Sequence, residues 1–221
     1  HTTLVRQIDK NVGSSTKSRM KSMFNLMYRY AIKYDIVEKN YAELCNSVKV
    51  KKKREKIPFT TEEIKKIWEI VEDVPFADMI LIEIYTGFRP IEMAEIKNKN
   101  VHLDENYIIG GTKTQAGTDR IVPIHPEIKP LITKRYNSEN EFLFNDYNKL
   151  AHNVTPLTYD KYRNRFKKVM TYLDMSHTPH ETRHTFITCA KNCKINDYIL
   201  KRVVGHEITD VTEKVYTHRN I

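Results

Sequence analysis

The sequence predicts a mainly α-helical protein with one small antiparallel β-sheet, which places it in the α+β class. Apolar residues recur at helical spacing along most of the 221 residues. Three short strand-like runs lie close together between residues 100 and 124. Polar turn residues separate these runs, so we expect neighbouring strands to pair in antiparallel hairpins.

The first 48 residues are predicted to form a helical unit. Its main helix is indicated by apolar residues at helical spacing and by hydroxyl residues that can cap its start: Met20, Met23, Phe24, Met27, Ala31 and Tyr34, with Ser14, Ser15 and Thr16 ahead of them. A shorter helix is expected from Tyr41 to Val48. Two helices are too few for a stable core, so we interpret this unit as the C-terminal part of a helical domain. The sequence does not begin with Met, and we expect it to be a fragment.

Residues 49–58 carry dense positive charge without an apolar period, and the run closes at Pro58. Such a segment is typical of a linker between domains. One interpretation is a solvated tether, and the alternative is a strap that lies over phosphates. The residues further along the chain favour the strap, and the predicted DNA-binding residues in it are Lys51, Lys52, Lys53 and Arg54.

Residues 59–221 form the second predicted unit. Thr60 and Glu63 match a capping box at the start of a helix in which Trp68 is expected to be packed core. Gly87 can end the next helix, and Pro90 can occupy the first turn of the one after it. The expected elements after the first helix are, in order, helices over Pro75 to Tyr85 and Pro90 to Lys97, strands over Asn100 to Leu103, Tyr107 to Ile109 and Arg120 to Ile124, and helices over Pro126 to Tyr136, Tyr159 to Leu173, Glu181 to Asn192, Asp197 to Val204 and Val211 to Tyr216.

The composition points to a polyanionic partner. The formal net charge is +9, so nucleic acid is the first candidate, and a basic surface without a specific partner is the alternative. Hydrophobic residues make up 40% of the chain, which is enough to bury a core and argues against disorder. Cys45, Cys189 and Cys193 lack a zinc-like pairing, which favours reduced thiols in a cytosolic compartment. No apolar run approaches the roughly 20 residues of a membrane span.

Two loop regions in the middle of the chain carry candidate functional residues. Arg89 lies where a glycine turn leads into a helix, a place that suits phosphate binding, although such an arginine can also be a plain surface residue. Glu92, one turn later, either holds that guanidinium or is a first-turn acid favoured by the helix dipole. Lys113 lies in the loop between two predicted strands. Loop lysines are usually solvated, but a hairpin tip can carry an ammonium that protonates a leaving oxygen.

Further candidates follow towards the end of the sequence. His180 and Arg183 are three residues apart on a predicted helix and face the same side. His184 shares that side, and its spacing from His180 would suit a metal, but no acid or cysteine partner stands out, so we predict no metal site. His206 follows a glycine at a helix end, and Tyr216 lies close to the last residue.

Together these residues resemble the tyrosine recombinase family, which includes phage and conjugative-transposon integrases and the Xer and Cre recombinases. The resemblance covers residues 59–218 in family order and is carried by Tyr-Thr-Gly-Phe-Arg89-Pro-x-Glu92, Thr-Lys113-Thr, His180-x-x-Arg183-His184, Gly205-His206 and Tyr216-Thr-His. It implies the tyrosine recombinase catalytic fold, preceded by the end of the family's helical core-binding domain. Only five residues follow Tyr216, so we expect the C-terminal tail, by which family members often contact a neighbouring protomer, to be truncated.

The resemblance implies a role for each candidate residue in cutting and rejoining DNA. Arg89 and Arg183 would grip the scissile phosphate, and His206 would donate a further hydrogen bond to it. Glu92 and His184 would have supporting roles. Arginine suits the task because it stays charged and clamps oxygens in a plane.

The nucleophile implied by the resemblance is Tyr216. A free tyrosine has a pKa of about 10, so only about one molecule in a thousand is ionised at pH 7 and the hydroxyl needs help. His180 would act near it as proton acceptor or orienting group, and Lys113 would be the general acid for the departing 5′ oxygen. The 3′ phosphate then stays covalently bound to Tyr216. Because that bond retains the energy for rejoining, no ATP, cofactor or metal is expected.

The same resemblance implies double-stranded DNA with recombination sites as the partner, a homotetramer on paired sites, and accessory excision or DNA-bending proteins. The implied activity is integration or excision of a mobile element in the bacterial cytoplasm, with the protein on the nucleoid when it is bound to DNA. Three alternatives stay open. A type IB topoisomerase would relax supercoils without paired sites, a catalytically silent DNA-binding protein would keep the fold, and a metal-dependent nuclease would be sensitive to a chelator.

Overall fold

The structure is a computed structural model that describes residues 13–45, 55–112, 115–148 and 152–207. The chain divides into two compact units, His1–Glu55 and Lys56–Ile221. The basic segment Lys51 to Arg54 and the predicted helix over Val211 to Tyr216 lie outside the described residues. None of the described helices is both long enough and apolar enough to cross a bilayer.

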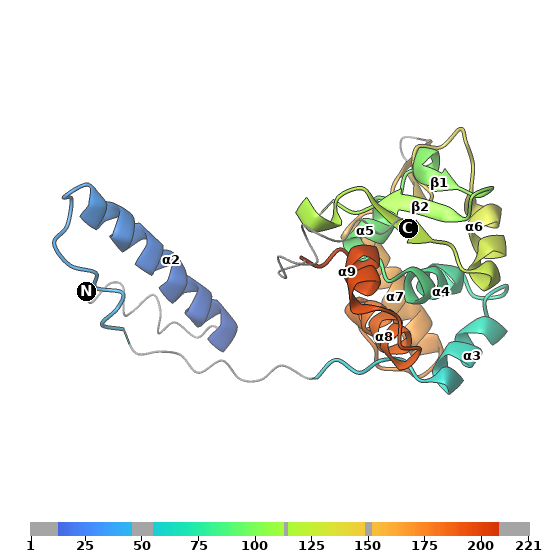
Figure 1. The fold of residues 1–221 in the computed structure, drawn as a ribbon, viewed down its shortest axis with the longest axis horizontal. Coiled ribbons are helices and arrows are strands. Elements are labelled where there is room, and N and C mark those ends of the chain that lie inside the picture. Colours follow the sequence, from blue (N-terminus) through green and yellow to red (C-terminus); the bar gives the residue numbers. More distant parts are fainter. Residues whose placement is uncertain (1–12, 46–54, 113–114, 149–151, 208–221) are drawn as a thin grey trace. The chain divides into compact units, whose positions relative to one another are not determined.

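The first unit contains helix α2 (Ser14–Lys33), which confirms the predicted helix (Figure 1). It ends where Asp35 adopts a positive φ of 54°. The predicted helix from Tyr41 is wrong for residues 41–45, which form turns. The reason is local: the Asn40 side chain accepts a hydrogen bond from Ala42 N at 3.0 Å, and the backbone bonds that follow span three residues instead of four.

The second unit begins with three helices, α3 (Thr61–Glu69), α4 (Ala77–Thr86) and α5 (Pro90–Ala94). The predicted capping box of α3 is confirmed by reciprocal bonds between Thr60 and Glu63. Helix α4 begins later than predicted because Phe76 is left-handed, with φ 73°. Helix α5 ends earlier than predicted because Lys97 leaves the helical path to pair with Phe142.

The predicted three-stranded sheet is confirmed, in the order β1 (Val101–His102), β2 (Tyr107–Gly110) and β3 (Arg120–Pro123). All pairs are antiparallel, and Ile108 in the middle strand lies opposite Val101 on one side and Val122 on the other. Short 3₁₀ turns, η1 (Asn98–Asn100) and η2 (Gln115–Gly117), flank the strands. The hairpin loop between β2 and β3 is the segment that contains Lys113.

A second sheet, β4 (Asn145–Asn148) with β5 (Asn153–Pro156), corrects the expectation of a single sheet. The sequence gives little sign of it because both strands are short and mostly polar, and neither shows a buried face among its described side chains. Tyr147 and Val154, which pair across the hairpin, are each about half exposed. Without burial there is no reason for apolar and polar residues to alternate.

The remaining helices agree with prediction apart from their ends: η3 (Pro126–Ile128) runs into α6 (Lys129–Arg135), followed by α7 (Tyr159–Tyr172), α8 (Pro179–Asn192) and α9 (Asp197–Val204). Helix α8 begins two residues before the predicted start. Thr178 forms a capping box with Glu181, and Pro179 occupies the first helical position.

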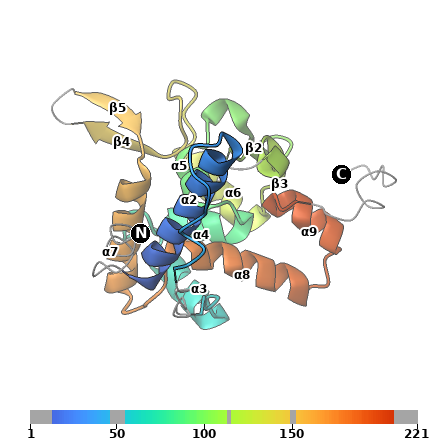
Figure 2. The same cartoon turned by 90° about the vertical axis from the view of Figure 1, so that its left-hand side faces the viewer.

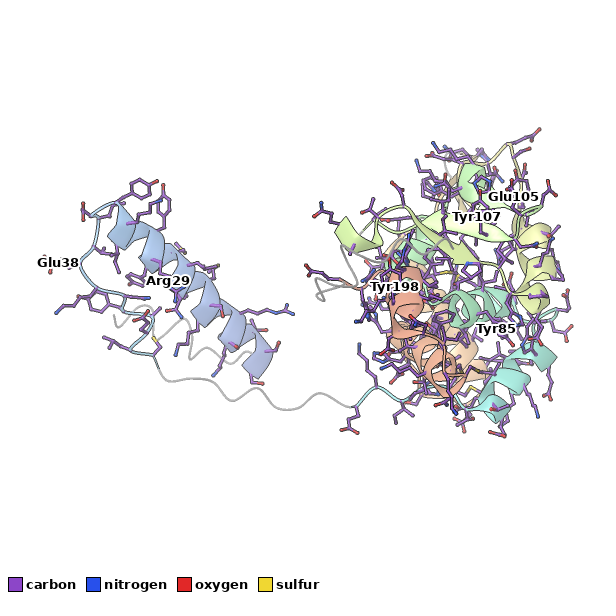
Figure 3. All side chains as sticks on the ribbon, in the orientation of Figure 1. Arg29, Glu38, Tyr85, Glu105, Tyr107 and Tyr198 are labelled. Carbon is purple, nitrogen blue, oxygen red and sulfur yellow. The ribbon has the colours of Figure 1, made fainter. Side chains whose placement is uncertain are left out.

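Helix α4 is the centre of the second unit's core (Figures 1 and 2). It contacts α3, α6, α7 and α8, and most of its side chains are fully buried. Side chains fill the space between these elements (Figure 3), and Trp68 packs at the edge, where its Nε1 donates to Tyr85 Oη at 3.3 Å. This packed centre positions the ends of α4 and α8, and α9 in turn packs on α8 and β3.

Candidate functional site

The first candidate, Arg89, lies in a sharp turn between α4 and α5. Gly87 ends α4 in the left-handed conformation, with φ 64°, which favours glycine. A Cβ added there would lie 2.5 Å from Phe186, so the close contact with α8 also requires glycine. Arg89 is extended and precedes Pro90 at the first position of α5. Its Nη1 donates to Glu92 Oε1 at 2.8 Å, and its Nη2 donates to the Gly205 carbonyl at 3.1 Å.

Glu92 is buried and joins two arginines. Oε1 pairs with Arg89, and Oε2 accepts from Arg120 Nη2 at 2.6 Å and from the Arg89 backbone N–H at 2.9 Å. Burial by itself raises the pKa of this carboxyl, but the hydrogen bond and charge of Arg120 and the hydrogen bonds from Arg89 outweigh it, and the pKa lies below its ordinary value. Of the two interpretations of Glu92, the structure therefore has the one in which it holds the guanidinium.

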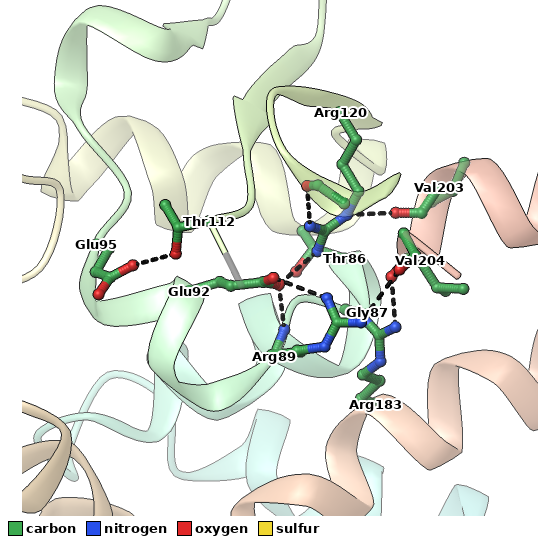
Figure 4. Close-up of polar contacts among 12 residues, drawn as sticks. Thr86, Gly87, Arg89, Glu92, Glu95, Thr112, Arg120, Arg183, Val203 and Val204 are labelled. Atoms are coloured by element: carbon green, nitrogen blue, oxygen red, sulfur yellow. Dashed lines mark hydrogen bonds and ion pairs between the residues drawn. The ribbon is translucent and has the colours of Figure 1, made fainter. Parts of the chain in front are cut away.

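Arg183 projects from α8 to the same place. Its Nη1 donates to the Gly87 carbonyl at 2.7 Å, and its Nη2 donates to the Val204 carbonyl at the end of α9 (Figure 4). Burial lowers the pKa of Arg183 to about 10, and the charges of Arg89 and Arg120 contribute to the decrease. Arg183 thus stays protonated at neutral pH, beside two further guanidinium groups.

His206 follows the turn that both arginines contact. Gly205, with φ 66°, ends α9 and its carbonyl accepts from Arg89, while the Val204 carbonyl accepts from Arg183. Burial lowers the pKa of His206 below its ordinary value of 6.5, and the charges of Arg183, Arg89 and Arg120 lower it further. A neutral imidazole beside these arginines is the expected state at pH 7.

The other two histidines lie in the first turns of α8. His180 is exposed, whereas His184 is partly buried. Burial lowers the pKa of His184, and the charge of Lys56 adds to the effect. Within the described ranges, no three His, Cys, Asp or Glu side chains are grouped so that they could hold a metal ion.

Two of the predicted catalytic residues, Lys113 and Tyr216, lie outside the described residues, as does the basic segment Lys51 to Arg54. Thr112, which precedes Lys113 in the sequence, donates a hydrogen bond from its hydroxyl to Glu95 Oε2 at 2.6 Å. Of the predicted site residues that the structure describes, it brings together Arg89, Glu92, Arg183 and His206 around the turn that ends α9.

Arg120 is part of this cluster and was missed by the sequence-based prediction, which placed it only in a strand. Its side chain is 4% exposed, and it donates to Glu92, to the Gly117 carbonyl and to the Val203 carbonyl. In β3, Arg120 and Val122 are buried while Ile121 and Pro123 are exposed, a pattern that the sequence Arg-Ile-Val-Pro does not reveal. A charged residue on a buried face requires a partner.

A second buried carboxyl, Glu83, was also missed. It lies in α4 with no exposed surface and accepts a hydrogen bond from the Tyr162 hydroxyl of α7. Burial raises the pKa of Glu83 to about 8, against the opposing effects of the Tyr162 hydrogen bond and the Arg183 charge. Glu83 is therefore mostly protonated at neutral pH.

Comparison with known families decides what kind of protein this is. The model of the phage integrase family matches residues 58–221, which is most of the chain. The chain belongs to the phage integrase family. This confirms the resemblance to tyrosine recombinases that the motifs indicated, and the matched range includes those motifs.

Curated relatives from bacteria and archaea agree. The chain is 25% identical over 232 residues to the tyrosine recombinase XerC of Pediococcus pentosaceus, an alignment that covers 95% of this chain and 73% of that protein. It is 27% identical to the tyrosine recombinase XerA of Pyrococcus horikoshii, with 76% of this chain and 60% of that protein covered.

Solved structures confirm the fold class. The Tn1549 transposon integrase, in complex with circular intermediate DNA, matches 99% of this chain and 80% of its own with a TM-score of 0.74 at 21% identity. A λ integrase tetramer bound to a Holliday junction matches 95% of this chain and 63% of its own with a TM-score of 0.71 at 18% identity. This phage integrase family member thus shares the integrase fold.

Proposed function

We propose that this phage integrase family member is a site-specific DNA recombinase that cuts and rejoins DNA through a covalent 3′-phosphotyrosine bond at Tyr216. The observation that carries the proposal is the meeting of Arg89 and Arg183 at one turn. They come from different elements, and both donate to successive carbonyls, Gly205 and Val204, directly before His206. Three groups able to bind phosphate are thereby gathered from segments far apart in the sequence.

The electrostatics of the cluster suit a phosphodiester. Attack on phosphorus builds negative charge on the non-bridging oxygens. Arginines that the fold already holds in position stabilise this charge without having to move during the reaction. A guanidinium has five N–H donors, and the side-chain bonds described above take two from Arg89 and two from Arg183. Glu92 offsets part of the repulsion between Arg89 and Arg120, so positive charge can be concentrated there.

The proposed reaction is a transesterification that balances without a cofactor. The Tyr216 oxygen forms a bond to the scissile phosphorus, and the bond from phosphorus to the 5′ oxygen breaks. His180 takes or orients the tyrosine proton, Lys113 gives a proton to the departing 5′ oxygen, and His206 donates to the phosphate. Rejoining is the same step in reverse, with a 5′ hydroxyl of the second strand as nucleophile.

We propose that the partners are double-stranded recombination sites, a tetramer of this chain on two paired sites, and accessory excision or DNA-bending proteins. The λ and Tn1549 integrases in the matched structures are bound to DNA, and one λ integrase is a tetramer on a Holliday junction, which supports the proposal. Integration or excision of a mobile element on the bacterial nucleoid, in the cytoplasm, is the setting in which this chemistry is useful.

The basic segment is proposed to contribute phosphate contacts. Replacing Lys51, Lys52 and Lys53 by Gln should flatten the dependence of log affinity on log salt, because fewer counterions are released on binding. Fluorescence anisotropy with labelled DNA at several salt concentrations measures the slope. An unchanged slope would leave the segment a solvated tether.

The decisive experiment uses a suicide DNA substrate whose cleaved end cannot be rejoined. The protein should form a covalent adduct that survives denaturing electrophoresis, and Tyr216→Phe should form none. Tyr172→Phe, at an exposed tyrosine of α7, is the matched control and should react normally. An adduct with Tyr216→Phe would reject the nucleophile, sensitivity to a chelator would indicate a metal nuclease, and relaxation of supercoils without paired sites would indicate a topoisomerase.

A further inference from the structure

Arg120 joins three segments, each of which carries or leads to a proposed catalytic residue. Its Nη2 donates to Glu92 Oε2 in α5 at 2.6 Å, and its Nη1 donates to the Gly117 carbonyl in the β2–β3 loop at 2.9 Å. Its Nε donates to the Val203 carbonyl of α9 at 2.8 Å. These segments adjoin Arg89, Lys113 and His206 respectively.

The guanidinium lies in a slot that glycines make possible. A Cβ on Gly111 would lie 2.1 Å from Arg120 Nη1 and 1.9 Å from the Gly117 carbonyl oxygen. A Cβ on Gly205 would lie 2.7 Å from Gly117 Cα and 3.2 Å from Arg120 Cδ. The backbones of two segments, the β2–β3 loop and the turn after α9, therefore approach this one side chain more closely than side-chain-bearing residues allow. The ring of Phe88, 4.8 Å from the guanidinium carbon, closes another side.

We propose that Arg120 is a positioning residue of the recombinase site, which sets the direction of Arg89 through Glu92 and fixes the turn that leads to His206. The inference rests on the proposed function. Arg120 donates to Oε2 of the Glu92 carboxylate, and Arg89 donates to Oε1 of the same group. Because the carboxylate is planar, the position of the Arg120 guanidinium constrains the position of the Arg89 guanidinium.

Arg120 acts on these neighbours and does not contact the DNA itself. Its side chain is 4% exposed, against 13% for Arg89, and each of its three nitrogens already donates to a protein oxygen. Arg89 is the more exposed of the two, so it is the guanidinium that a phosphate could reach.

Arginine is required for this role because its three bonds diverge from one rigid plane. A lysine keeps the positive charge, but a single ammonium at the end of a flexible stem cannot replace three nitrogens in a fixed fork. Arg120→Lys therefore separates position from charge. We expect Arg89 to be displaced in this variant, because Glu92, its carboxylate partner, loses the contact with Arg120 that holds Glu92 in place.

The test measures the first-order rate constant of covalent adduct formation at saturating suicide DNA, with the dissociation constant for DNA measured separately. Arg120→Lys should lower the rate constant by about 10-fold to 100-fold, the scale of a misplaced catalytic group, while affinity for DNA changes little. Arg135→Lys is the matched control, because Arg135 also pairs with a carboxylate, Asp78, and lies over Phe144, but belongs to α6. Its rate constant should stay within about twofold of wild type, because the side-chain contacts of Arg135 within the described residues are with Asp78, Phe76 and Phe144, none of which belongs to the site.

A double-mutant cycle provides the readout that general destabilisation would not move. If Arg120 acts through Glu92, Arg120→Lys should slow the Glu92→Gln protein much less than it slows the wild type. Independent, multiplied effects would overturn the proposal, as would a normal rate in Arg120→Lys. Rates are compared at a temperature at which circular dichroism shows full folding, with Arg120→Gln as second variant. If neither variant folds, Arg120 is a stability residue alone and the proposal fails.

The two proposals fail separately. If the wild-type protein forms no adduct with any suicide DNA substrate tested, the recombinase function itself is rejected. If the wild type forms the adduct and Arg120→Lys forms it equally fast, the recombinase function stands and only the positioning role of Arg120 is lost.

Discussion

Glu83 and Glu92 are both buried, but their surroundings shift the pKa of the carboxyl group in opposite directions. Around Glu92, two arginines donate to the two carboxylate oxygens, and the pKa is lowered although burial opposes the charge. Around Glu83, the Tyr162 hydroxyl is the hydrogen-bond donor, and burial raises the pKa to about 8. Burial makes ionisation of a carboxyl group unfavourable, and the hydrogen-bond donors and charges around the group determine whether it is nevertheless ionised.

The comparison also separates two uses of a polar group in a core. The charged region lies where α5, α8, α9 and the β2–β3 loop meet, with positive charge in excess. The neutral region lies between α4 and α7 inside the packed core. We therefore expect substitutions in the first region to alter the chemistry, and substitutions in the second to alter how stability depends on pH.

The largest expected difference is in the rate of adduct formation between Arg89→Lys and Tyr162→Phe. Loss of the arginine fork at Arg89 should slow adduct formation by about 100-fold to 1000-fold, because a donor to the developing charge is lost. Tyr162→Phe removes the hydrogen bond to Glu83 and should leave the rate of the folded protein nearly unchanged. Single-turnover cleavage of a suicide DNA substrate measures both. Similar slowing in the two variants would erase the distinction between the regions.

A smaller effect is expected for the stability of Glu92→Gln. The amide keeps the shape but removes the negative charge on which Arg89 and Arg120 converge, so the free energy of unfolding at pH 7 should fall by about 1.5 to 3 kcal/mol, the scale of hydrogen bonds to charged groups. Urea denaturation followed by circular dichroism gives the value. Glu83→Gln is the matched control, since it replaces a carboxyl that is already mostly neutral, and it should be tolerated at that pH. Equal losses in the two variants would contradict the opposite charge states.

A separate test of Glu83 is the dependence of the free energy of unfolding on pH. The pKa of Glu83 rises from 4.5 to about 8 in the folded protein, so between these values the folded state holds a proton that the unfolded state releases. The contribution of this group to stability is therefore fully present below pH 4.5 and is lost as pH rises towards and through 8. Glu83→Gln should gain stability relative to wild type as pH rises from 5 to 8, as measured by urea denaturation. A constant difference across that window would show that Glu83 is ionised throughout.

Local signals in the sequence predicted most elements because the causes of those elements are local. Thr60 and Glu63 lie in one turn of chain, so the capping box that starts α3 can be recognised without any fold. The predicted span of α9 agrees with the structure because Asn196 caps one end and Gly205 closes the other. The hairpin β4–β5 was missed because its exposed strands carry no alternation from which to predict it.

In the candidate site, too, some residues were recognisable from the sequence and others were not. The ordered arginines and histidines were recognisable because their spacing along the chain resembles a family pattern, and the phage integrase match confirms that resemblance. Arg120 and Glu83 were missed because their partners, Val203 for one and Tyr162 for the other, lie far away in the sequence. The catalytic roles of all the candidate residues stay predictions, and Lys113 and Tyr216 also lie outside the described residues.

By itself, the sequence determined the helix caps, the class of fold, the excess of positive charge and the identities of the side chains available for phosphate chemistry. Only the tertiary structure decided which of those side chains meet, that Glu92 is charged and shared between Arg89 and Arg120, and that Glu83 is mostly neutral. The physical reason is that caps and periodicity depend on neighbours within a turn or two. The charge state of a buried group depends on desolvation and on partners that folding brings from distant segments.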